Sequence, residues 1–166
     1  MQRLQPKRLK TISLVSMSDI TVSSAVSCAI NHIGTGIYSS GKIVSYLLTK
    51  GFPDDISYAA VAELVDRGYI DDRRAARKVL IAREGKKQES RNYILNRLLQ
   101  AGIKESIAEE IASSLDDDVT TCKRLFDASF NSSDTDKDEF LKLAKLRGYS
   151  METSLKAHSL WLSDHN

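Results

Sequence analysis

The sequence has few of the residues from which catalytic and metal sites are built. Its 166 residues include two cysteines, three histidines and two prolines. Cys28 and Cys122 stand apart with no neighbouring ligand pattern, which argues against a disulfide framework and a zinc site. We expect both thiols in the core. No nucleophile and base, phosphate loop or ligand cluster is apparent, so the sequence predicts no enzyme activity, no cofactor and no metal.

Long apolar runs are also missing. Hydrophobic residues make up 42% of the chain, yet no stretch approaches the roughly 18 consecutive apolar residues that span a bilayer. The basic N-terminal segment is interrupted by Ser13, Ser16, Ser18 and Asp19, so it lacks the apolar region of a signal peptide. We expect a cytoplasmic protein with no membrane segment.

Positive charge is concentrated in one part of the chain. The net charge is +2, but residues 73–104 contain ten Lys and Arg against only Glu84 and Glu89, a local charge of +8. Such a segment attracts phosphate or an acidic protein face. From charge alone, a solvated helix face is an equal alternative to a binding surface. The candidate binding residues are Arg73, Arg74, Arg77, Lys78, Arg83, Lys86, Lys87 and Arg91.

A repeated segment marks the organisation of the chain. The three copies are LLTKGFPDDI at 47–56, LLQAGIKESI at 98–107 and LAKLRGYSMETSL at 143–155. In each copy an apolar helix end precedes Gly51, Gly102 or Gly148, and a new helix start follows. Glycine suits this place because the residue after a helix often takes a left-handed conformation that penalises Cβ.

Acidic residues form a second repeated marker. Asp71 and Asp72 reappear as the acidic run 116–118, about one repeat later. A carboxylate at a helix start accepts unpaired amide hydrogens and favours the positive end of the helix dipole. We therefore interpret these residues as helix caps rather than as a catalytic pair.

The hydrophobic residues recur at spacings of three and four, as in Ile56, Ala60 and Leu64, which predicts amphipathic helices. The predicted fold class is all-α, with three tandem three-helix repeats that resemble helix-turn-helix units without a wing and form an elongated curved array. The repeats are expected at 23–70, 71–115 and 116–166. The predicted helices span 23–34, 40–50, 54–67, 72–85, 87–101, 104–115, 119–130, 136–147 and 150–162.

Two segments fall outside this pattern. Within residues 1–22, the stretches 10–15 and 19–22 are short, Ser-rich and β-branched. They predict an N-terminal arm over 1–22 that is either a short β-hairpin or flexible. Residues 131–138 are a polar linker in which acidic residues, from Asp134 onward, have the spacing of the start of a calcium-binding loop. Glu139 replaces the required glycine and Lys145 the required glutamate, so we reject calcium binding.

Taken in order, the markers resemble the RecX family, regulators of the RecA recombinase. The resemblance covers about residues 27–162 and is carried by Lys50-Gly51-Phe52, by GYIDD at 68–72, by Arg83 and by 98–103. It implies a non-enzymatic protein that lies in the groove of the RecA filament on single-stranded DNA. It further implies modulation, with inhibition expected, of ATPase, strand exchange and filament extension in DNA repair and SOS control.

The chain departs from the family pattern at several positions. Ala75 and Val79 stand where the family has Phe and Tyr, and Lys42 replaces the glutamate of an opening capping box. Two other functions stay open: a helix-turn-helix DNA-binding module with 91–99 on its recognition helix, and a helical adaptor for an acidic protein. We expect a monomer, and weak, salt-sensitive binding to free DNA.

Overall fold

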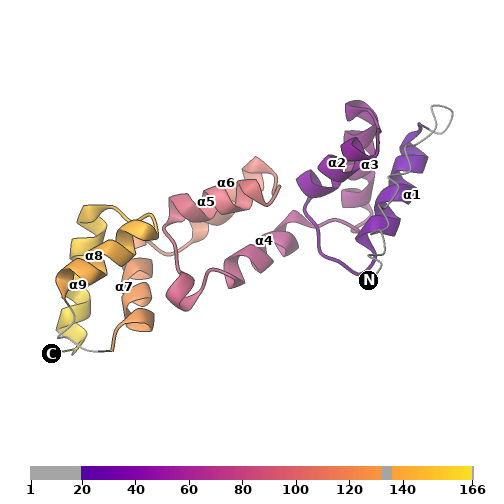
Figure 1. The fold of residues 1–166 in the computed structure, drawn as a ribbon. Helices are drawn as coiled ribbons and strands as arrows, with labels where there is room; N and C mark the ends of the chain where they lie inside the picture. The colour runs from indigo at the N-terminus through magenta and orange to yellow at the C-terminus, as the bar shows by residue number, and fades with distance from the viewer. Residues whose placement is uncertain (1–19, 132–135, 166) are drawn as a thin grey trace, which may run out of the picture. The chain divides into compact units, whose positions relative to one another are not determined.

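The computed structural model describes residues 20–131 and 136–165 (Figure 1). Within these residues every regular element is helical and no strand occurs, which confirms the all-helical prediction for this part of the chain. The predicted N-terminal arm, apart from its last three residues, lies outside the described residues, as does Asp134. The grouping of the helices into three repeats stays a prediction.

Each predicted helix has a counterpart in the structure. The described residues form α1 (Val22–Ile33), α2 (Ser40–Thr49), α3 (Asp54–Asp66), α4 (Asp72–Ile81), the 3₁₀ helix η2 (Gly85–Lys87), α5 (Arg91–Gln100), α6 (Glu105–Ser114), α7 (Asp118–Ser129), α8 (Lys137–Leu146) and α9 (Met151–His165). None of them is long and apolar enough to cross a membrane.

The chain divides into two compact units. The described part of unit 1 comprises residues 20–36 and 43–69, and that of unit 2 comprises residues 37–42 and the chain from residue 70 onward. Helix α2 therefore begins in unit 2 and ends in unit 1. In unit 1, α1 packs against α3, and Ala29, Leu47 and Leu64 are fully buried.

Unit 2 contains two hydrophobic clusters. The first joins α4, α5 and α6 around Ala76, Ile94 and Leu98. The second joins α7, α8 and α9, which gather into one bundle in Figure 1. There the Phe140 ring lies 4.8 Å, centroid to centroid, from Trp161. Such aromatic contacts add to the stabilisation that burial gives this cluster.

The glycines behave as the repeat predicts. Gly51, Gly102 and Gly148 have φ angles of 92°, 77° and 84°. Gly148 is constrained further, because a Cβ placed there would lie 2.5 Å from Cδ1 of Tyr93. The turn after α8 is thus packed directly on the ring of an α5 residue.

In each acidic marker, two adjacent aspartates cap different helices. The Asp71 carboxylate accepts a hydrogen bond from the Arg74 amide at the start of α4. The buried Asp72 carboxylate instead accepts from the amide of Ser40, the first residue of α2, at 2.6 Å, and from the Lys104 amide at 2.8 Å. In the next copy Asp118 accepts from the amide of Arg91, the first residue of α5, at 2.8 Å. The second aspartate of each pair therefore joins elements distant in sequence.

Two expectations need correction. Helix α4 ends at Ile81 and α5 starts at Arg91, whereas the sequence predicts helix up to 85 and again from 87. Gly85, with a φ of 58°, starts the 3₁₀ turn between them and interrupts the α-helical pattern. Cys122 is buried as expected, but Cys28 is only half-buried.

Candidate partner-binding surface

The outer face of α4 carries three cations. Arg74, Arg77 and Lys78 are exposed, while Ala75 and Ala76 on the opposite side are buried. Spacings of three and four residues bring the three cations onto one helix face. Among the described residues, none provides these three side chains with an ion-pair partner. Their charge is therefore available to an external anionic group.

Arg73, their neighbour, is already paired. Its guanidinium donates two hydrogen bonds to the Glu110 carboxylate on α6, at 2.8 and 2.7 Å. The hydrogen bond raises the pKa of Arg73 and lowers that of Glu110. Both side chains are more than half exposed, so the pair stabilises the fold little. It does neutralise the charge of Arg73 locally.

Arg83 belongs to a cluster around a buried carboxylate. Glu89 is 3% exposed, and the Arg97 guanidinium donates to its two oxygens at 3.1 and 3.0 Å. The Arg83 Nε lies 3.8 Å from one of these oxygens. The hydrogen bond to Glu89 raises the pKa of Arg97. A buried carboxylate needs such partners to offset its lost hydration, so Arg83 has a structural role here.

The 3₁₀ helix η2 carries two further cations. Lys86 and Lys87 are exposed, and their ammonium groups have no ion-pair partner among the described residues. The backbone of Lys86 is held in place, because its carbonyl accepts a 2.8 Å hydrogen bond from the Arg147 guanidinium. The η2 turn therefore presents two exposed ammonium groups on a backbone that is held by a hydrogen bond.

Arg91 is occupied by the backbone. Its guanidinium donates to the carbonyls of Leu115 and Asp116, at the end of α6, with an Nε to oxygen distance of 3.1 Å for Asp116. The last carbonyls of a helix lack partners within the helix, and a cationic side chain can satisfy them. Arg91 therefore positions the segment between α6 and α7.

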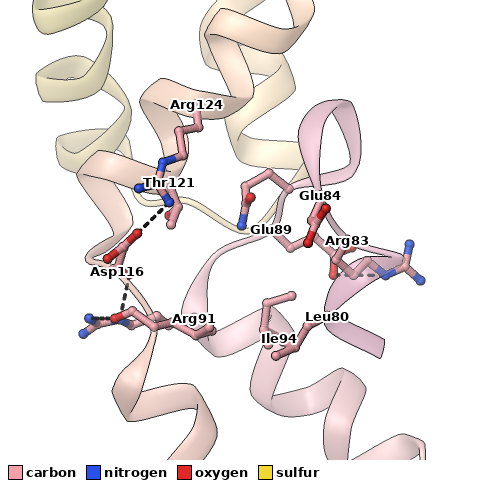
Figure 2. Close-up of a pocket in the computed structure, with 11 residues that line it drawn as sticks. Leu80, Arg83, Glu84, Glu89, Arg91, Ile94, Asp116, Thr121 and Arg124 are labelled. Atoms are coloured by element: carbon pink, nitrogen blue, oxygen red, sulfur yellow. Dashed lines mark hydrogen bonds and ion pairs between the residues drawn. The ribbon is translucent and has the colours of Figure 1, made fainter. Parts of the chain in front are cut away.

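A cavity of about 250 Å³ lies beside these residues (Figure 2). Figure 2 shows Arg91 and Arg124 approaching Asp116 from two sides, and the Arg124 Nη1 lies 2.6 Å from a carboxylate oxygen of Asp116. The lining holds equal numbers of arginines and carboxylates. These charges are Arg83, Arg91, Arg124, Glu84, Glu89 and Asp116. Because its charges balance, the cavity favours neither an anion nor a cation.

The eight predicted residues thus divide into two groups. Arg73, Arg83 and Arg91 interact with other parts of unit 2. The other five have no ion-pair partner among the described residues and are called the free cations: Arg74, Arg77, Lys78, Lys86 and Lys87. Ile81, which is 67% exposed at the end of α4, is not among the residues predicted from the sequence. The signal was its spacing, because an isoleucine three residues after Lys78 and four after Arg77 falls on the charged face.

No family model matches the chain. By sequence it is similar to the regulatory protein RecX of Leuconostoc citreum (strain KM20), with 25% identity over 92 residues, which are 55% of this chain and 35% of that relative. By structure it is similar to RecX from Lactobacillus salivarius, with a TM-score of 0.64, 17% identity and coverage of 86% of this chain and 97% of the other. The chain is thus similar to RecX proteins in sequence over part of its length and in fold over most of it.

The two comparisons support the RecX assignment in different ways. At 17% identity, the structural likeness shows a shared fold over most of the chain. The sequence match supplies the family name but spans only about a third of the curated relative. The resemblance noted from the ordered glycine and aspartate markers is therefore confirmed for the RecX family. The roles of individual side chains have to be argued from their geometry.

Proposed function

We propose that this RecX-family chain regulates a RecA recombinase by binding in the groove of the RecA filament on single-stranded DNA. It acts in the cytoplasm as a monomer and without catalysis. Bound there, it inhibits ATPase activity, strand exchange and filament extension in DNA repair and SOS control. The observation that carries the proposal is the set of free cations on α4 and η2, in a chain whose curated relative is named a regulatory protein.

The free cations suit a highly charged target. A nucleoprotein filament presents phosphates and acidic side chains at high density, and unpaired Lys and Arg raise the rate and strength of such encounters. Because the contact is electrostatic, its affinity falls as salt concentration rises. Binding to free DNA by the same cations is weak and salt-sensitive.

An ATPase assay tests the proposal. RecA is incubated with single-stranded DNA and ATP, with increasing amounts of the full chain, and excess chain lowers the hydrolysis rate. The triple variant Arg74→Glu, Arg77→Glu, Lys78→Glu loses this inhibition, because its α4 face is now negative. A normal hydrolysis rate at excess wild-type chain would overturn the proposal.

The matched control reverses three cations on another helix of ten residues. Lys137, Lys142 and Lys145 are exposed on α8, so changing all three to Glu alters the net charge equally. This control variant keeps its inhibition. Equal loss of inhibition in the two triple variants would show that net charge, rather than the α4 face, is responsible.

One observation favours a second function, duplex DNA binding through α5. Asn92, Asn96 and Gln100 are exposed at four-residue spacing, and such amides can pair with adenine edges in the major groove. The two arginines of this helix, Arg91 and Arg97, are instead occupied by carbonyls and by Glu89. Salt-resistant binding to a defined duplex without RecA would favour this function.

A further inference from the structure

Ile81 is an exposed aliphatic residue within a charged face. It is the last residue of α4 and is 67% exposed. It lies three residues after Lys78, four after Arg77 and seven after Arg74, so all four side chains share one face of α4. Among the described residues, the face therefore combines three cations that have no ion-pair partner with one large apolar group.

The core does not require Ile81. The hydrophobic cluster of α4, α5 and α6 takes Ala75 and Ala76 from α4, with Val79 and Leu80 packed at its edge. Ile81 lies outside that cluster and is exposed to water. An exposed isoleucine contributes little to folding, whereas its burial by a partner is favourable in proportion to the apolar area covered.

The presence of an isoleucine among the cations of this face distinguishes between a nucleic acid and a protein as its partner. A phosphate backbone is hydrated and polar, so contact with it leaves an isoleucine side chain without an apolar environment. Acidic protein surfaces can place an apolar pocket among carboxylates. Interfaces of this type bury an aliphatic anchor and surround it with charged pairs at the rim.

We propose that α4 docks through Arg74, Arg77, Lys78 and Ile81 onto an acidic protein surface that contains an apolar pocket. This inference rests on the proposed function and deepens it, since it assigns the α4 contact to the recombinase protein and not to the DNA in the filament. Charge complementarity sets the orientation, and burial of Ile81 adds affinity that salt does not screen.

Two binding measurements with the full chain test the inference. The first is the dissociation constant for the RecA filament on a labelled single-stranded oligonucleotide, and the second is that for the same oligonucleotide alone. Ile81→Ala weakens filament binding roughly tenfold, equivalent to about 1.4 kcal/mol, and leaves binding to the oligonucleotide unchanged. Ile81→Leu keeps filament binding within about twofold, because it preserves the apolar volume.

The matched control is Leu160→Ala. Leu160 is a 49% exposed aliphatic residue on α9. Its neighbours at four residues in either direction, Lys156 and Asp164, are ion-paired with Glu152 and Lys123. The control leaves both dissociation constants unchanged, since its face lacks free cations. Circular dichroism checks that each variant keeps its helix content.

The possible results separate the alternatives. If Ile81→Ala binds the filament as wild type does, the apolar contact is overturned while the proposed function stands. If the variant weakens oligonucleotide binding as much as filament binding, the face contacts DNA and the inference fails. If sedimentation shows a dimer that Ile81→Ala dissociates, the occupant is a second copy. Absence of wild-type filament binding would overturn both the proposed function and the inference.

Discussion

Adjacent aspartates at the start of α4 have different structural roles, and substituting each should show it. Asp72 is 7% exposed, and its two carboxylate oxygens accept from the Ser40 amide at 2.6 Å, the Ser40 hydroxyl at 2.7 Å and the Lys104 amide at 2.8 Å. Asp71 is exposed and accepts from the Arg74 amide at 3.1 Å. Replacement of each aspartate by alanine changes the net charge equally.

The hydrogen bonds set the expected magnitudes. Asp72→Ala leaves the partly buried amides of Ser40 and Lys104 without an acceptor. Each unsatisfied group lowers the free energy of unfolding by about 1–3 kcal/mol. The Ser40 hydroxyl can turn toward water and adds little. We expect a loss of about 3 kcal/mol in the free energy of unfolding. Asp71→Ala removes one exposed helix cap and costs about 1 kcal/mol.

Urea denaturation followed by far-UV circular dichroism measures the difference. With a slope of about 2 kcal/mol per molar urea, the Asp72→Ala midpoint lies about 1 M below that of Asp71→Ala. Equal midpoints, or a lower midpoint for Asp71→Ala, would refute the argument that Asp72 joins the starts of α2 and α6. Asp118→Ala, which frees the Arg91 amide, should fall between the two.

Other predictions concern single sites. Gly148→Ala should lower the melting temperature more than Gly68→Ala: both have positive φ, but only the first Cβ meets an α5 tyrosine ring. Burial and a nearby lysine lower the pKa of His158 in the folded state, so the free energy of unfolding should fall as pH drops below about 6.5, and His158→Gln should flatten this dependence. Burial raises the pKa of Cys122 to about 12, so a thiol reagent at pH 8 should modify half-buried Cys28 well before Cys122, and equal rates would contradict this.

Local signals allowed much of the fold to be predicted. Spacing of hydrophobic residues located each helix, and Gly51, Gly102 and Gly148 were recognised as helix ends from their place in the repeat. A break between α4 and α5 was predicted at residue 86, but the α-helical conformation is interrupted from 82 to 90. The length of this break was missed because the composition of that segment still favours a helix. Periodicity detects the helix but is weak at its ends.

The candidate site was less predictable, because charge in sequence does not reveal pairing in space. Arg73 meets a glutamate 37 residues away, and Arg91 meets carbonyls 24 and 25 residues away. Only packing of α4, α5 and α6 brings these partners together. Ile81 was not predicted as a site residue because a hydrophobic residue on a helix is expected to be buried, and only the packing shows that this one is exposed.

The central claim is that the outer face of α4 contacts the recombinase in the filament. It is tested most directly by a photo-reactive amino acid in place of Ala82, which is exposed and directly follows Ile81, leaving the free cations intact. Irradiation with the assembled filament should give a covalent adduct with a RecA subunit, whereas the same group in place of exposed Ser159 on α9 should not. An adduct from position 159 and none from position 82 would contradict the account.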